Sequence, residues 1–147
     1  MSTELTFLNA PEGLAPGTGY SHVVWGTGRF IAVSGQCAFD QDRAIVGVGD
    51  PEAQARQVFE NIRRCLAAAG ATLDDVLKLT YFVTDITHLP QIRTARNEVF
   101  DPSRLPASSA VQVAALIEPE LLVEIEAFAL VPETRAATAP ARDQEQG

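Results

Sequence analysis

Residues 50–70, DPEAQARQVFENIRRCLAAAG, predict an amphipathic helix. Asp50 is a suitable N-cap, Pro51 occupies the first helical position, and Gly70 follows the last turn. Apolar residues recur between these ends at spacings of three and four, and therefore form one stripe; they are Ala55, Val58, Phe59, Ile62, Cys65, Leu66 and Ala69. The charged residues in the middle of the segment lie largely off this stripe, so the helix has one face that can pack against a core.

Extended segments precede this helix. Residues 21–25 and 29–35 are rich in β-branched and aromatic side chains, and the short Gly26-Thr27-Gly28 loop between them predicts a β-hairpin. A second turn is expected near residues 40–42, which read DQD.

Further elements follow the helix. Residues 72–75 predict a capping turn and residues 76–84 a strand. A second, more ragged helix is expected over residues 89–100, before Pro102, and two strands at 107–116 and 121–131, joined by a turn around Glu118-Pro119. Because only two helices can cover a sheet whose strands are apolar on both faces, we expect one sheet face to be left for another subunit. The sequence therefore predicts an oligomer.

Length and composition indicate one domain. The chain has 147 residues, of which 46% are hydrophobic and 20% charged, the profile of an ordinary soluble α/β-type domain. Residues 1–131 contain no internal repeat, so we expect a single domain there. Residues 132–147 contain no Val, Ile, Leu or aromatic residue, and such a segment cannot offset its ordering entropy. That segment is predicted to be a disordered tail.

The charge balance narrows the class of partner. Eleven basic and nineteen acidic residues give a formal net charge of −8, and so acidic a surface repels nucleic acid and anionic lipid. Lys78 is the only lysine, which leaves a Schiff-base or P-loop mechanism almost no lysine to use. We therefore expect a small, uncharged or zwitterionic partner, or none, and neither a nucleic-acid nor a membrane partner.

Targeting, metal and cofactor signals are not visible in the sequence. The first residues show no basic region followed by an apolar one, and no apolar run approaches the ~18 residues of a membrane span. Cys37 and Cys65 suit a reducing compartment, so a cytoplasmic location is expected. His22 and His88 have no partner at ligand spacing, and the glycines match no nucleotide motif, so we expect no metal and no cofactor.

Two carboxylates near the end of the chain are candidates for chemistry. Because side chains alternate along a strand, Glu124 and Glu126 share one face with Phe128 and lie about 7 Å apart. Such a pair can serve as a base and a water-orienting group. The alternative is a solvated strand end or an inter-subunit ion pair with arginine, and periodicity alone favours that alternative.

Hydroxyl and thiol groups are weaker candidates. Ser108 and Ser109 begin a strand but lie in no Gly-x-Ser-x-Gly elbow, so turn and capping duty is favoured over a nucleophilic role. Cys37 follows residues 34–36, a small-residue strand end where backbone can approach a ligand. A buried, inert thiol is favoured there over a reactive one.

Taken together, seven segments of the chain resemble the Rid (YjgF-like) family, in the family's order and over residues 20–131. Each segment alone is a weak signal, whereas the colinear set is specific. The segments are Gly19-Tyr20-Ser21, Val33-Ser34-Gly35-Gln36, Gln54 with Phe59-Glu60-Asn61-Ile62, Ala69-Gly70-Ala71-Thr72 with Asp75-Val76, Val83-Thr84-Asp85, Pro106-Ala107-Ser108-Ser109, and Val123-Glu124-Ile125-Glu126-Ala127.

This resemblance implies a fold and an assembly. Family members share an α+β, chorismate-mutase-like fold, with a mixed β-sheet and two helices packed on one face. They form homotrimers with a cleft at each subunit interface. The best-known members are imine and enamine deaminases, which hydrolyse reactive products of pyridoxal-phosphate enzymes to 2-keto acids and ammonia. The resemblance therefore implies a small-molecule substrate.

The resemblance also assigns roles to residues. The family's water-activating glutamate falls on Glu124, and its cleft positions fall on Tyr20 and Ser34. A cleft position that is often asparagine falls on Arg93, which is the candidate anion partner. The arginine that follows Pro-Ala in the family, and that grips the substrate carboxylate, is replaced here by Ser108.

Two functions follow from these assignments. The first is hydrolytic deamination of an imine or enamine, with Glu124 and Ser108 at the reacting centre and Ser109 beside them in the cleft. The second is a non-catalytic trimeric ligand-binding or chaperone-like protein that lost deaminase activity together with the motif arginine. The retained Glu124 favours the enzyme.

Overall fold

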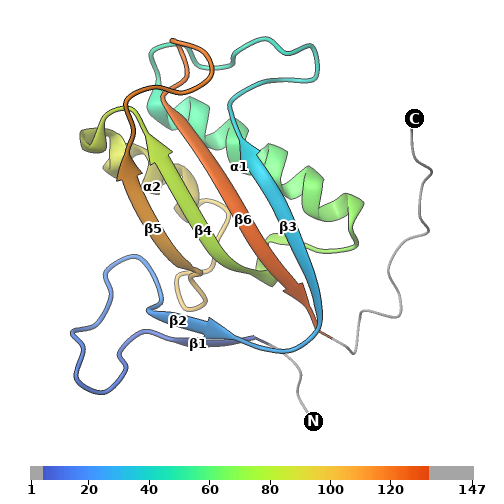
Figure 1. The fold of residues 1–147 in the computed structure, drawn as a ribbon, viewed down its shortest axis with the longest axis vertical. Helices are drawn as coiled ribbons and strands as arrows, with labels where there is room; N and C mark the ends of the chain where they lie inside the picture. Colours follow the sequence, from blue (N-terminus) through green and yellow to red (C-terminus); the bar gives the residue numbers. More distant parts are fainter. Residues whose placement is uncertain (1–4, 133–147) are drawn as a thin grey trace.

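A four-stranded sheet carries both long helices on one face (Figure 1). The computed structural model describes residues 5–132. The sheet has the order β3-β6-β4-β5, formed by β3 (Arg29–Gln36), β6 (Val123–Val131), β4 (Val76–Val83) and β5 (Ala107–Gln112). β6 is antiparallel to both of its neighbours, whereas β4 and β5 are parallel. This mixed sheet with helices on one face confirms the α+β fold; the predicted tail lies outside the described residues except for Pro132.

Helix α1 (Pro51–Ala68) has the predicted limits. The Asp50 side chain accepts a hydrogen bond from the Ala53 backbone N–H at 3.1 Å, which caps the first turn. Gly70 has a φ of 79°, the left-handed conformation that commonly ends a helix. The predicted stripe faces the sheet, with Phe59, Ile62 and Leu66 almost fully buried.

The side chains of strand β6 alternate between the two faces of the sheet. Its odd-numbered residues, from Val123 to Val131, are buried under the helices, whereas its even-numbered residues are only partly covered. The even-numbered residues face the side of the sheet without helices, which we call the open face (Figure 1). One end of this face is apolar, because the rings of Phe30 and Phe128 lie 5.5 Å apart there and Phe30 is 59% exposed.

The predicted hairpin between residues 21–25 and 29–35 is wrong. Strand β2 (Val23–Trp25) pairs instead with β1 (Thr6–Leu8) in a separate two-stranded sheet, while β3 pairs with β6. Gly28 has a φ of 150°, and a Cβ there would lie 2.7 Å from the carbonyl carbon of Val131. The loop therefore passes closely over the end of β6, a path that glycine permits, and does not reverse the chain between paired strands.

Other boundaries also differ from expectation. Helix α2 (Leu89–Asn97) ends before Phe100, whose ring packs edge-on against Phe59 with centroids 5.8 Å apart. The turn near Glu118 is present, since the Leu121 N–H donates to the Glu118 carbonyl at 3.1 Å, but β4 lies between the two strands that it joins. The capping turn is the short 3-10 helix η1 (Leu73–Asp75), and a second, η2 (Ile86–His88), precedes α2.

The helices of the described part include none that is both long enough and apolar enough to cross a membrane.

Candidate functional site

Glu124 occupies a gap that glycine leaves in the neighbouring strand. The β3–β6 register shifts between Val33 and Gln36, so β3 bulges at this point. A Cβ built on Gly35 would lie 2.9 Å from Cδ of Glu124 and nearer still to its Oε1. Any side chain larger than hydrogen at residue 35 would therefore displace the Glu124 carboxylate from this position.

The Cys37 thiol contacts the same carboxylate. Cys37 is buried directly after β3, and its thiol hydrogen bonds to Glu124. Burial first, and then the negative charge and hydrogen bond of Glu124, raise the pKa of Cys37 to about 11. The thiol is therefore protonated at neutral pH, where it serves as an S–H donor to Glu124 and is a poor nucleophile.

A cavity of about 880 Å³ opens beside this pair. It lies between the end of β3, the loop that follows it to residue 43 and the side of α1 that carries Gln57, Asn61 and Arg64, and we call it the Glu124 cavity. The residues that line it include Gly35, Cys37, Phe39, Arg43, Asn61 and Glu124. The volume exceeds that of a small metabolite and falls in the range of ordinary ligand sites.

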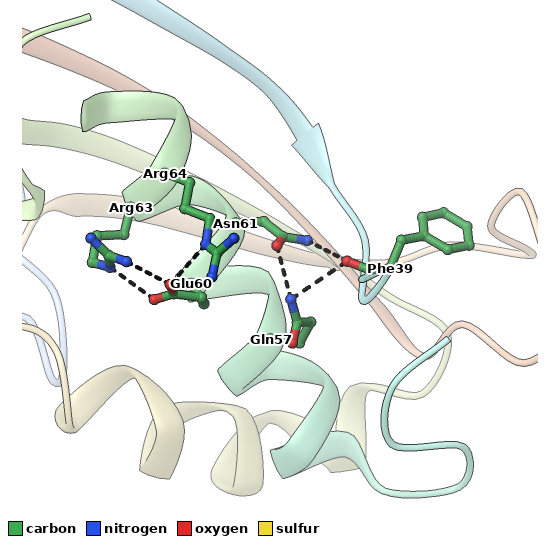
Figure 2. Close-up of polar contacts among 6 residues, drawn as sticks. All are labelled: Phe39, Gln57, Glu60, Asn61, Arg63 and Arg64. Carbon is green, nitrogen blue, oxygen red and sulfur yellow. Dashed lines mark hydrogen bonds and ion pairs between the residues drawn. The ribbon is translucent and has the colours of Figure 1, made fainter. Parts of the chain in front are cut away.

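Helix α1 fixes the loop that walls this cavity (Figure 2). The Asn61 side-chain amide donates to the carbonyls of Cys37 and Phe39 at 3.0 and 2.9 Å. Gln57 donates to the Asn61 side-chain oxygen at 2.9 Å and orients that amide. Because a helix side chain satisfies both loop carbonyls, the wall of the cavity is attached to the rigid part of the fold.

The predicted site residues on the open face lie on different strands. Ser34 is exposed on β3, on the same face as Glu124. Ser109 is on the edge strand β5, where its hydroxyl accepts a hydrogen bond from Lys78 at 3.3 Å and where it pairs with Thr80. The open face therefore carries Ser34, Ser109 and Glu124, with β4 between the last two.

Ser108 points to the opposite side of the sheet. It pairs in parallel register with Leu79, which is buried beneath the helices, and directly paired residues share a face. Ser108 and Glu124 thus lie on opposite faces of one sheet, two strands apart. Within one chain they do not form a common reacting centre.

Tyr20 lies in the loop between β1 and β2, away from the Glu124 cavity. Its ring meets His22 edge-on with centroids 5.2 Å apart, and it lines a separate cavity of about 220 Å³. The preceding carbonyl, of Gly19, accepts a 2.6 Å hydrogen bond from the buried Arg96 of α2. Ser21 forms a bridge with Ala107, so this loop adjoins the start of β5.

Arg93 lies on α2, on the helix-covered side of the sheet, and is exposed. Burial raises the pKa of the Tyr81 hydroxyl to about 12, and the charges of Arg96 and Arg93 partly oppose that rise. Arg93 is not among the residues that line the Glu124 cavity.

Within residues 5–132, no cluster of three or more His, Cys, Asp or Glu side chains is arranged to hold a metal ion. His22 contacts the Ala15 carbonyl at 2.8 Å through Nε2, and His88 lies 3.9 Å from Asp85. Each histidine thus has a local structural contact.

Comparison with protein families and curated proteins gives consistent matches. The family model described as endoribonuclease L-PSP matches residues 9–131. A RutC family protein from Pyrococcus horikoshii is 37% identical over 121 residues, which are 82% of this chain and 91% of the relative. A RutC family protein from Pyrococcus abyssi is 35% identical over 130 residues, which are 88% of this chain and 98% of the relative.

Solved structures with the same fold agree with these matches. A Rid family protein, YyfB from Yersinia pestis, is similar with a TM-score of 0.80 and 34% identity, over 87% of this chain and 99% of that one. RidA from the Antarctic bacterium Psychrobacter is similar with a TM-score of 0.66 and 32% identity, over 89% of this chain and 100% of that one. The chain therefore belongs to the Rid (YjgF-like) family.

Proposed function

We propose that the chain hydrolyses a small imine, enamine or related conjugated metabolite, with Glu124 as the base that activates water. The main support for this proposal is the position of the Glu124 carboxylate. It lies in the gap at Gly35, contacts the Cys37 thiol and borders the Glu124 cavity, where a ligand can reach it. An enamine first tautomerises to the imine; water then adds to the C=N carbon while Glu124 accepts its proton, and that proton is passed to the nitrogen. The hydroxyl group of the adduct then loses its proton as the C=O bond forms and the C–N bond breaks, so that the protonated amine leaves as ammonia and a keto group remains.

The reacting site in this proposal lies between subunits of a homotrimer. The open face supports this arrangement, because its apolar end carries Phe30 beside Phe128 and lacks a covering helix among the described residues. The separation of Tyr20 and Ser108 from Glu124 supports it as well. A cleft between two chains can bring the β5 edge of one chain to the Glu124 cavity of the next.

Light scattering of the wild type is expected to give the mass of three chains, and Phe30→Glu is expected to shift the protein towards monomer. The variant places a charge in the apolar end of the open face, where association would desolvate it. Val48→Glu is a matched control, because Val48 is 60% exposed but lies in a loop outside the sheet. A monomeric wild type would contradict the inter-subunit cleft.

A second candidate function is favoured by one observation. Ser108 stands where deaminases of the family have their carboxylate-binding arginine, and a hydroxyl cannot replace a bidentate guanidinium. A trimeric ligand-binding or chaperone-like protein without turnover fits that change. The description of the family model suggests RNA cleavage. A net charge of −8 disfavours this activity, because it repels a phosphate backbone.

Ammonia and keto-acid release from enzymatically generated 2-iminopropionate and larger imino acids tests the proposal. The wild type is expected to release both products from at least one of these substrates. Ser108→Arg is compared with Ser109→Arg, which adds the same charge on the opposite face of β5. An inactive wild type that gains activity only in Ser108→Arg would overturn the proposal and support the non-catalytic alternative.

A further inference from the structure

Arg43 is a cation of the Glu124 cavity that a tight turn holds in place. The Asp40 carboxylate accepts hydrogen bonds from the backbone N–H groups of Asp42 and Ala44 at 2.8 and 3.0 Å. The Arg43 N–H donates to the Asp40 carbonyl at 3.0 Å. Arg43 has a φ of 63°, the only non-glycine residue of the described part in the left-handed region. That conformation is unfavourable for arginine, and the hydrogen bonds of the turn compensate its cost.

The Arg43 guanidinium is stacked in a way that leaves its donors free. Its carbon atom lies 4.4 Å from the centre of the Phe39 ring, so the ring covers one face of the planar group. The N–H donors of a guanidinium project in its plane and can still bind a carboxylate in two-pronged fashion. Phe39 itself is tied to α1 through the Asn61 hydrogen bond to its carbonyl (Figure 2). The cation is thus positioned before a ligand arrives.

The other arginine that lines the cavity already has a partner. Arg64 also borders the cavity, but it donates to the Glu60 carboxylate at 2.9 Å. For Arg43, no carboxylate of residues 5–132 lies within ion-pair distance. Arg43 and Glu124 nevertheless both act on the Cys37 thiol, since Glu124 raises its pKa and Arg43 lowers it. The cation and the carboxylate therefore line one cavity together with this thiol.

We propose that Arg43 binds the carboxylate of the substrate in the Glu124 cavity and thereby selects imino and enamine acids over neutral imines. This inference rests on the proposed function, because it takes Glu124 as the base. In a 2-imino acid the carboxylate is bonded directly to the reacting carbon, so its cation must share the cavity with the base. Arg43 meets that requirement from the loop after β3, whereas Ser108 lies on β5 and Arg93 does not line this cavity.

Equilibrium binding of 2-oxobutyrate, measured by calorimetry, tests this assignment on the intact chain. The probe resembles the keto-acid product and carries the relevant carboxylate, while its methyl ester lacks the charge. Wild type is expected to bind the acid at least tenfold more tightly than the ester and to bind the acid less tightly as salt increases. Failure of the wild type to bind the acid, or to distinguish it from the ester, would overturn the inference.

Arg43→Asn removes the cation without straining the turn, because asparagine tolerates the left-handed conformation. We expect the Kd for 2-oxobutyrate to rise at least tenfold and the Kd for the ester to change less than twofold. Arg43→Lys keeps the charge but loses the planar fork, and is expected to recover part of the affinity. Arg63→Gln is the matched control, since Arg63 pairs with Glu60 on the outer surface of α1. Equal affinity for the acid in Arg43→Asn and wild type would overturn the inference.

Turnover separates this inference from the proposed function. If wild type binds the acid through Arg43 but releases no ammonia from any imino acid, the hydrolase proposal fails and the anion site stands. If wild type hydrolyses imino acids and Arg43→Asn leaves KM unchanged, the hydrolase proposal stands and the role of Arg43 is refuted.

Discussion

Replacing Glu124 with glutamine is expected to lower kcat for imine hydrolysis by about 10²- to 10⁴-fold, the usual contribution of a positioned general base. Glutamine has the same shape but cannot accept the proton of the attacking water. Circular dichroism and thermal unfolding are expected to match the wild type, because Glu124 is on the partly covered face of β6 and outside the core. Ammonia release under saturating substrate measures the loss.

Two further variants sharpen this experiment. Glu126→Gln removes the other carboxylate of the same face, which is not among the residues lining the Glu124 cavity, and should change kcat only a few-fold. Gly35→Ala retains the Glu124 carboxylate but occupies the gap in which it lies, so it should lower kcat without removing the base. Equal turnover in Glu124→Gln and wild type would exclude Glu124 as the base.

Gln54→Leu is expected to lower the free energy of unfolding by about 3 kcal/mol or more, because each buried polar group left without a partner costs about 1–3 kcal/mol. Gln54 is fully buried in α1. Its amide donates to the carbonyls of Gly47 and Glu120 at 3.1 and 2.9 Å, and its oxygen accepts from the Leu122 N–H at 2.8 Å. Leucine has a similar size but leaves the Leu122 N–H and the Glu120 carbonyl without these bonds, while the Gly47 carbonyl keeps its bond from the Asp50 N–H.

Denaturant unfolding at one fixed protein concentration measures this loss, since assembly would otherwise alter the apparent stability. Gln112→Leu is the matched control: the exposed Gln112 side chain accepts one hydrogen bond, from the Ile86 N–H at 2.9 Å. That change should cost less than about 1 kcal/mol. A Gln54→Leu protein as stable as the control would show that the three bonds contribute little.

Local signals predicted the elements well and their pairing poorly. The limits of α1 depend on Asp50 and Gly70, and the two faces of β6 on simple alternation, so both could be predicted from short stretches of sequence. The partner of β3 could not. This strand pairs with β6, about a hundred residues away, as in the pair Phe30 and Leu130. Periodicity reports that a segment is extended, but it does not report which strand lies beside it.

The candidate site shows the same division. Alternation placed Glu124 and Glu126 on one face, and the resemblance selected Glu124, which lies beside the cavity. Residues 34–36 were recognised as a small-residue strand end, but the gap at Gly35 depends on a register shift against β6 that this stretch alone does not specify. The turn near residues 40–42 was predicted and is present, but the left-handed conformation of Arg43 and its stacking on Phe39 were not. For α2 a signal was available, since helical spacing from the buried Ile92 leads to Arg96, the buried arginine that holds the loop before Tyr20.

The order of strands has a consequence for biosynthesis. β6 lies between β3 and β4 in the sheet, yet it is the last of the four strands to leave the ribosome. Until it emerges, β3 has no strand to pair with, and neither does one edge of β4. The nascent chain therefore holds β3 and one edge of β4 unpaired while residues 37–122 are synthesised, and the sheet closes only after β6 has emerged.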